Sequence, residues 1–168
     1  MMLTKKQIFP VSYFAPYKNG QNIYALKTSF KKIPSFVKID STGNEKVIFE
    51  PGVMLNNTYS FNYPFIVFNE HKNTRWGNVT FNNIVLHNVE NGTTRYLVKK
   101  QRIYSSKLST DNKKIVSVEV NGSLQWFLTV RQAVDGNLLQ SFGFDTLQPV
   151  QPVFNNNADT VAFIAIGN

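Results

Sequence analysis

Short polar clusters followed by apolar runs recur along the chain. Three of these runs begin at Ile23, Ile115 and Val161, and each follows a polar cluster that contains Asn. The runs start 92 and 46 residues apart, so the first interval is twice the second. Fixed spacings of this size indicate repeated structural units. The pattern therefore predicts a further, degenerate copy near position 69, where the apolar segment 63–68 follows a shortened turn.

A second mark keeps nearly the same spacing. Glycine turns at Gly43, Gly92 and Gly136 are 49 and 44 residues apart, and apolar segments flank each of them. Glycine adopts the positive φ that tight hairpin turns require. The polar turns before apolar runs and the glycine turns thus repeat with nearly the same period. This predicts a repeated antiparallel unit rather than hairpins that happen to be evenly spaced.

Each unit has the order strand, Asn/Asp turn, strand, loop, strand, glycine turn, strand, which is one blade of a β-propeller. The sequence thus predicts an all-β, single domain over residues 1–168: a partial β-propeller of about three and a half four-stranded antiparallel blades. The predicted blades span residues 12–50, 59–101 and 104–144, with a half blade at 151–168. A β-sandwich or meander is the alternative, but a sandwich does not require two marks in register.

Composition agrees with this architecture and narrows the function. Fourteen Phe and seven Tyr favour strands, and the absence of Cys excludes disulfide scaffolds and thiol nucleophiles. Eighteen basic and ten acidic residues give a net charge of +8. The basic residues are scattered beside turns, so we predict no nucleic-acid partner. No apolar run has the length of a signal peptide or membrane span, and we expect no transmembrane segment in this chain.

The sequence contains no recognisable catalytic or metal-binding constellation. His-Glu-x-x-His, Gly-x-Ser-x-Gly and glycine-rich phosphate-binding patterns are absent. The two histidines, His71 in a polar loop and His87 in a strand, have no partner at metal-ligand spacing. The turn carboxylates Asp40, Glu90 and Asp135 can cap local backbone N–H groups. We therefore predict that the chain is not an enzyme and that it holds no metal and no cofactor.

Four side chains are candidates for binding a ligand or partner: His71, Arg75, Trp76 and Glu119. An Arg beside an exposed Trp suits the recognition of carboxylates, sugars or peptides, through charge-assisted bonds and stacking. The alternative is that Trp76 packs over a blade edge. Glu119 alternates with apolar neighbours, so its side chain should point from the opposite sheet face, where it could bind a ligand if that face lined a channel.

The turn segment Ser109–Val116, Ser-Thr-Asp-Asn-Lys-Lys-Ile-Val, resembles the Ser-Pro-Asp-Gly-Lys-Lys-Ile-Ala hallmark of TolB-like propeller repeats. The propellers of prolyl oligopeptidase-family peptidases share this hallmark. Thr110 stands where Pro is usual and Asn112 where Gly is usual, but Asn tolerates the left-handed region that the turn needs. The segments 75–78 and 84–92 are also similar to TolB-like propellers in envelope proteins of Bacteroidetes. Such a likeness specifies an architecture and not a ligand.

The resemblance implies a part of a larger periplasmic or cell-surface protein. TolB-like propellers usually close with six blades, so the remaining blades or a second copy, as in a homodimer, would cover the exposed blade faces. We expect a non-catalytic binding or scaffolding module with a protein, peptide or glycan partner. The alternatives are an accessory propeller that gates substrate entry to a prolyl oligopeptidase-like domain outside this chain, and a glycosidase-like propeller with paired carboxylates.

Overall fold

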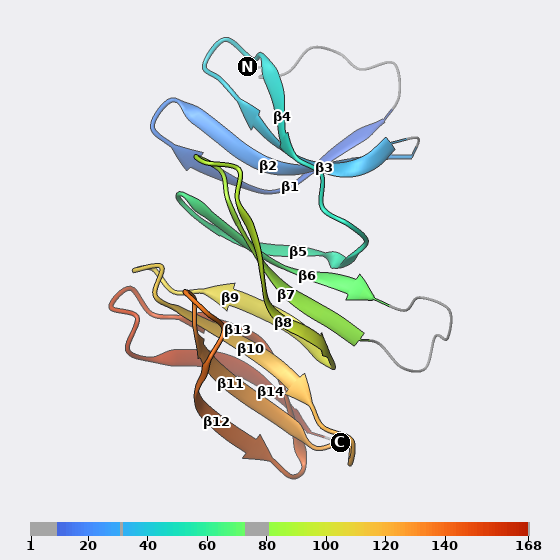
Figure 1. Ribbon diagram of the computed structural model, residues 1–168, viewed down its shortest axis with the longest axis vertical. Coiled ribbons are helices and arrows are strands. Elements are labelled where there is room, and N and C mark those ends of the chain that lie inside the picture. The colour runs from blue at the N-terminus through green and yellow to red at the C-terminus, as the bar shows by residue number, and fades with distance from the viewer. Residues whose placement is uncertain (1–9, 31, 73–80, 168) are drawn as a thin grey trace.

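The computed structural model describes residues 10–30, 32–72 and 81–167. Within them, fourteen strands form three four-stranded antiparallel sheets and one two-stranded sheet. The three four-stranded sheets follow one another along the long axis of the molecule, and the two-stranded sheet overlaps the third of them in this view (Figure 1). The described residues contain no helix, and so none that could cross a membrane. The predicted all-β partial propeller is confirmed.

Each sheet contains strands that are consecutive in the sequence and that pair in sequence order. Blade 1 consists of β1 (Val11–Asn19), β2 (Asn22–Ser29), β3 (Lys32–Ile39) and β4 (Glu45–Phe49). Blade 2 consists of β5 (Met54–Asn62), β6 (Phe65–Lys72), β7 (Phe81–Asn88) and β8 (Thr94–Gln101). Blade 3 consists of β9 (Ile103–Leu108), β10 (Lys114–Val120), β11 (Trp126–Gln132) and β12 (Leu138–Phe144). The half blade consists of β13 (Leu147–Phe154) and β14 (Val161–Gly167).

The first strands of successive blades lie against one another: β5 packs on β1 and β9, and β9 packs on β13. Because neighbouring strands are antiparallel, the turn after the first strand and the turn after the third strand of a blade lie at the same end. We call this end the turn face and the opposite end the loop face.

The hydrophobic core lies between blades and follows the two-residue period of the strands. In β6, Ile66 and Phe68 join the core shared with blade 1, while Val67 joins the core shared with blade 3. Successive side chains of a strand point to opposite faces, so a strand packed between two blades is apolar at consecutive positions. This explains the continuous apolar runs on which the repeat was recognised.

The turn at 109–114 has the conformation that its sequence predicts. Asn112 has a φ of 61°, in the left-handed region, and its N–H donates to the carbonyl of Ser109 at 3.1 Å. The Ser109 hydroxyl donates to Asp111 at 2.6 Å and accepts from the N–H of Lys114 at 2.9 Å. Asn at the position usually held by Gly therefore preserves the turn.

Candidate functional site

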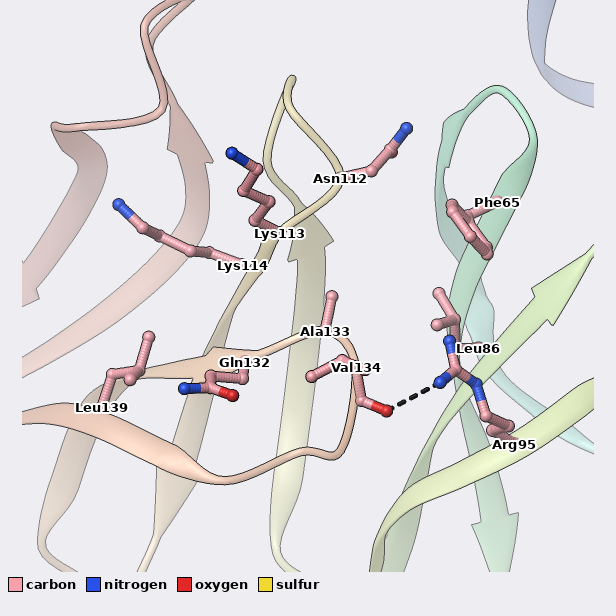
Figure 2. Close-up of a pocket in the computed structure, with 10 residues that line it drawn as sticks. All are labelled: Phe65, Leu86, Arg95, Asn112, Lys113, Lys114, Gln132, Ala133, Val134 and Leu139. Atoms are coloured by element: carbon pink, nitrogen blue, oxygen red, sulfur yellow. Dashed lines mark hydrogen bonds between the residues drawn. The ribbon is translucent and has the colours of Figure 1, made fainter.

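A hollow of about 480 Å³ lies between blade 2 and blade 3 at the turn face, and we call it the turn-face pocket (Figure 2). Blade 2 contributes residues of β6, β7 and β8, and blade 3 contributes the β9–β10 turn, the β11–β12 turn and β12. Its wall is apolar and consists of Phe65, Leu86, Ala133, Val134 and Leu139. Its polar lining consists of Arg95, Asn112, Lys113, Lys114 and Gln132.

One backbone hydrogen bond joins the two blade 3 turns that line this pocket. The N–H of Ala133 donates to the carbonyl of Lys113 at 2.8 Å, and the Ala133 side chain is buried in the core between blades 2 and 3. Gly136 closes the β11–β12 turn with a φ of 80°. A Cβ atom at Gly136 would collide with the carbonyl group of Leu97 in blade 2, so only glycine fits there.

All three charged side chains that line the turn-face pocket are basic. Arg95 reaches across from β8, and its Nη1 donates to the carbonyl of Val134 at 2.7 Å (Figure 2). Lys114 Nζ donates to the carbonyl of Ala158 at 2.9 Å. The rest of the Arg95 guanidinium has no hydrogen-bond acceptor within the described part of the chain, so it can donate to a ligand.

Asp111, in the β9–β10 turn beside the pocket, is already engaged by its own turn. The Ser109 hydroxyl bond lowers the pKa of Asp111 below its ordinary value, and the backbone N–H of Lys113 and the charges of Lys113 and Lys114 lower it further. Asp111 is therefore ionised at neutral pH and offsets part of the lysine charge. Arg95 lies on the other blade, in β8.

This lining suits one kind of ligand chemistry. A mostly apolar pocket with a few polar groups accepts an apolar side chain and orients it through those groups. An Arg fork and Lys ammonium groups at the rim bind carboxylates through charge-assisted hydrogen bonds. The pocket therefore fits an apolar group that carries, or lies beside, a carboxylate.

The residues predicted from the sequence lie elsewhere or cannot be placed. Arg75 and Trp76 fall outside the described residues. His71, expected in a loop, is the next-to-last residue of β6, because β6 continues as far as Lys72. Its Nδ1 lies 3.1 Å from Asn82 Oδ1, and Asn82 Nδ2 donates to the carbonyl of Ile103 at the start of blade 3. This places His71 at the loop face, away from the turn-face pocket.

Glu119 also lies at the loop face, where it pairs with Ile103 in register. It lines a hollow of about 440 Å³ together with Phe81, Lys100 and Arg102. However, its carboxylate accepts two bonds from Arg131, Nε to Oε1 at 3.0 Å and Nη2 to Oε2 at 3.1 Å. It also accepts hydroxyl bonds from two residues of the same blade, Ser117 at 3.0 Å and Thr129 at 2.6 Å. These bonds join β10 to β11, and a ligand of Glu119 would have to displace some of them.

His87 packs in the seam between blades 1 and 2. Its ring stacks on Phe49 with centroids 4.1 Å apart, and its Nδ1 lies 2.9 Å from Thr94 Oγ1. Nε2 is buried and has no hydrogen-bond partner among the residues that the structure describes. Burial lowers the pKa of His87, which keeps the ring neutral. Among the described residues no group of three or more His, Asp or Glu side chains could hold a metal ion.

In the sequence, Lys113 and Lys114 are only two of the basic residues that are scattered beside turns. Arg95 belongs to a different repeat, 18 residues earlier, and no motif links it to them. The usable signal was the blade order, because it places the turns at 109–114 and 132–137 at the same end of blade 3. The contribution of blade 2 follows only from the packing of two sheets in space.

No protein-family model matches the chain, and no curated protein matches it. Solved structures with a similar fold include the following three. TolB from Agrobacterium tumefaciens has a TM-score of 0.65 at 13% identity, over 88% of this chain and 51% of that chain. The β-propeller domain of the Trilobed protease from Pyrococcus furiosus has a TM-score of 0.60 at 10% identity, over 88% and 47%. A chain of the nidogen/laminin complex has a TM-score of 0.60 at 11% identity, over 88% and 53%.

The TM-scores support a common fold. Sequence identities this low do not support a shared activity. The chain spans about half the length of each of these solved chains. The chain is a partial β-propeller of three complete blades and one half blade. This conclusion rests on the strand order, on the core between blades and on the similarity to the three solved propellers.

Proposed function

We propose that this chain is a non-catalytic binding module whose turn-face pocket holds an acidic peptide segment of a protein partner by an apolar side chain. One observation carries the proposal: the pocket has an apolar wall, and all of its charged lining side chains are basic. An acidic peptide with a buried Leu or Phe matches both properties.

The expected affinity is modest. Burial of one Leu or Phe side chain contributes about 1.5–3 kcal/mol. Each hydrogen bond to a charged group contributes about 1.5–3 kcal/mol. One apolar anchor and one or two such bonds amount to roughly 5 kcal/mol before the entropy cost of association, so the dissociation constant of the pocket alone should be no tighter than about 0.1 mM. A partner that also contacts neighbouring turns would bind more tightly.

The comparisons support a binding role without assigning a partner. One neighbour is a chain of the nidogen/laminin complex, which is a complex of two proteins. The TolB likeness and the hallmark turn at 109–116 support our further proposal that the parent protein belongs to the bacterial envelope, in the periplasm or at the cell surface, as in Bacteroidetes. Detection of the parent protein in the cytoplasmic fraction alone would contradict that location.

A second candidate is an accessory propeller of a serine peptidase. The likeness to the propeller domain of the Trilobed protease favours it. In this case the catalytic residues belong to another domain of the same polypeptide. A Gly-x-Ser-x-Gly segment in the full-length polypeptide, with serine-hydrolase labelling by a fluorophosphonate probe, would support this candidate, and the lack of both would remove it.

The binding proposal is tested with fluorescein-labelled peptides in which one Leu or Phe is flanked by Glu residues. Fluorescence anisotropy measures their affinity for the unmodified chain and for a double variant that carries Arg95→Gln and Lys113→Gln. The control is Lys46→Gln, an exposed lysine on β4. We expect the double variant to bind about tenfold more weakly, since it loses at least one charge-assisted bond.

Two results would contradict the assignment of this pocket. Equal affinities of the double pocket variant and the control would show that the peptide binds elsewhere. Equal affinity for a peptide with Ser in place of the apolar anchor would show that only charge attracts it. Loss of affinity at high salt is expected in either case and does not discriminate.

A further inference from the structure

We propose that the hollow at the loop face between blades 2 and 3 binds a small aromatic anion. The ring of the ligand lies against Phe81 and Phe127. Its carboxylate or phosphate group binds Lys100 and Arg102. The hollow has a volume of about 440 Å³, and both blades that form it have all four strands. It lies at the opposite end of these blades from the turn-face pocket, so this second site does not depend on the first.

The charged side chains of this hollow leave an unpaired positive charge. Lys100, Arg102 and Glu119 line it. The Glu119 carboxylate is neutralised by its two hydrogen bonds from Arg131, at 3.0 and 3.1 Å. The ammonium group of Lys100 and the guanidinium group of Arg102 have no acceptor or ion-pair partner among the residues that the structure describes. Two unpaired cations at one hollow favour a ligand with a carboxylate or phosphate group.

The backbone beside the hollow has an unusual conformation. Lys100 has a φ of 52°, in the left-handed region that residues other than glycine rarely adopt. It lies in a β-bulge of β8, where the pairing register with β7 shifts between Asn82 and Ile84. A regular strand presents every second residue to one side, but here the three consecutive residues 100–102 all line the hollow. Bulges and strained backbone often lie beside functional sites, where they redirect side chains.

A buried polar chain holds this bulge in place. The Oδ1 atom of Asn83 accepts from the backbone N–H of Lys100 at 3.0 Å. The Asn83 amide group donates to Glu70 Oε2 at 3.0 Å, and both of these residues are buried. Buried polar groups that satisfy one another make a local structure rigid. The strained backbone at Lys100 is therefore a fixed part of blade 2, which holds it at the wall of the hollow.

Two aromatic rings, one from each blade, form the apolar part of the hollow. Phe81 is the first residue of β7 in blade 2, and Phe127 belongs to β11 in blade 3. Both residues are partly exposed. The neighbours Trp126 and Leu128 pack in the core on the half-blade side of β11, so the Phe127 side chain points to the blade 2 side. Aromatic rings attract one another beyond the burial of apolar area, so an aromatic ligand suits this wall.

The test uses phenyl phosphate and phenylacetate as probes, and two-dimensional NMR of the isotope-labelled chain as the measurement. Titration should shift the amide signals of residues 100–102 and 119–122, which line the hollow. Dissociation constants of roughly 1–10 mM are expected for ligands of this size. The probe that binds more tightly identifies whether the site prefers a phosphate or a carboxylate. Lys100→Gln or Arg102→Gln should raise the dissociation constant about tenfold, because each removes a charge-assisted hydrogen bond.

The matched control is Lys99→Gln. Lys99 is an exposed lysine next to Lys100 and is not among the residues that line the hollow. This variant should bind both probes with the affinity of the unmodified chain. The double variant Arg95→Gln and Lys113→Gln, at the turn-face pocket, should also leave the shifts at residues 100–102 unchanged.

Three results would overturn the proposal. Absence of shifts at residues 100–102 with either probe, or shifts confined to the turn-face pocket, would show that the anion does not bind at this hollow. Equal weakening by Lys99→Gln and Lys100→Gln would show that only the general positive charge attracts the probes. Inorganic phosphate with the same affinity as phenyl phosphate would show that the two Phe rings take no part in binding.

Discussion

The ion pair between Glu119 and Arg131 allows a quantitative test of how blade 3 is held together. Both side chains are largely buried, with 14% and 12% exposure, and two parallel hydrogen bonds join them. Arg131→Met removes the guanidinium and leaves the carboxylate with its bonds from Ser117 and Thr129. Glu119→Met leaves Arg131 with the carbonyl of Gly136, 3.2 Å from Nη1.

Removal of one partner from a buried ion pair costs about 3–5 kcal/mol, because the remaining charge stays in a poorly solvated site. The two hydroxyl donors stabilise the remaining Glu119 carboxylate, so we expect Arg131→Met to lower the free energy of unfolding by about 3 kcal/mol. Glu119→Met should cost a similar amount. In the double variant no charge remains, and two Met side chains of similar volume pack together, so the loss should be below about 2 kcal/mol.

Urea denaturation of the three variants and the unmodified chain, followed by circular dichroism, measures these free energies as a double-mutant cycle. The control is Lys46→Met, which removes an exposed lysine of β4 and should change stability by less than about 0.5 kcal/mol. A cost of Arg131→Met no larger than the control, or a double variant that loses the sum of both single losses, would refute the reasoning.

Two further predictions concern a turn and a buried histidine. Gly136→Ala should lower the free energy of unfolding, measured by urea denaturation, by at least about 1 kcal/mol, because φ is 80° and the new Cβ meets Leu97. The control Gly92→Ala has a φ of 71° and open space around the new Cβ, so it should cost less. Equal losses would contradict the contact of Gly136 with blade 2. His87 has a pKa lowered by burial, so the unfolded chain binds its proton more readily and stability falls as pH drops below about 6.5. The loss is at most about 1.4 kcal/mol per pH unit for this one group. His87→Phe, which keeps a ring beside Phe49, should lose stability less steeply between pH 7.5 and 5.5 in urea titrations, and parallel slopes would refute the role of this proton.

Turn chemistry was predictable wherever one residue and its near neighbours decide it. Asp40 Oδ1 accepts from the N–H groups of Thr42 and Asn44, as predicted, and Asp135 accepts from the N–H of Asn137. The prediction for Glu90 was wrong: the cap of that turn is Asn88, whose Oδ1 accepts from the N–H of Glu90 at 2.8 Å. The short Asn side chain accepts from the backbone N–H two residues ahead. The turn is therefore capped without the Glu90 side chain.

The repeat also predicted the blades, because a strand packed between two sheets must be apolar at consecutive positions. The candidate pocket was beyond reach for a different reason. Arg95 and Lys113 come together only through the separation and twist of two sheets, which no local pattern encodes. Glu119 was identified as a polar residue on an apolar strand, but its full set of donors, including Arg131 on the next strand, needed the pairing register.

The packing order of the sheets has a mechanical consequence. Each blade packs against its sequence neighbours, and no extensive packing joins blade 1 to blade 3 in the described part of the chain. Unfolding free energy in such an array approximates a sum of module terms and seam terms, as in linear repeat proteins. Force applied to the two ends should therefore peel sheets away one at a time.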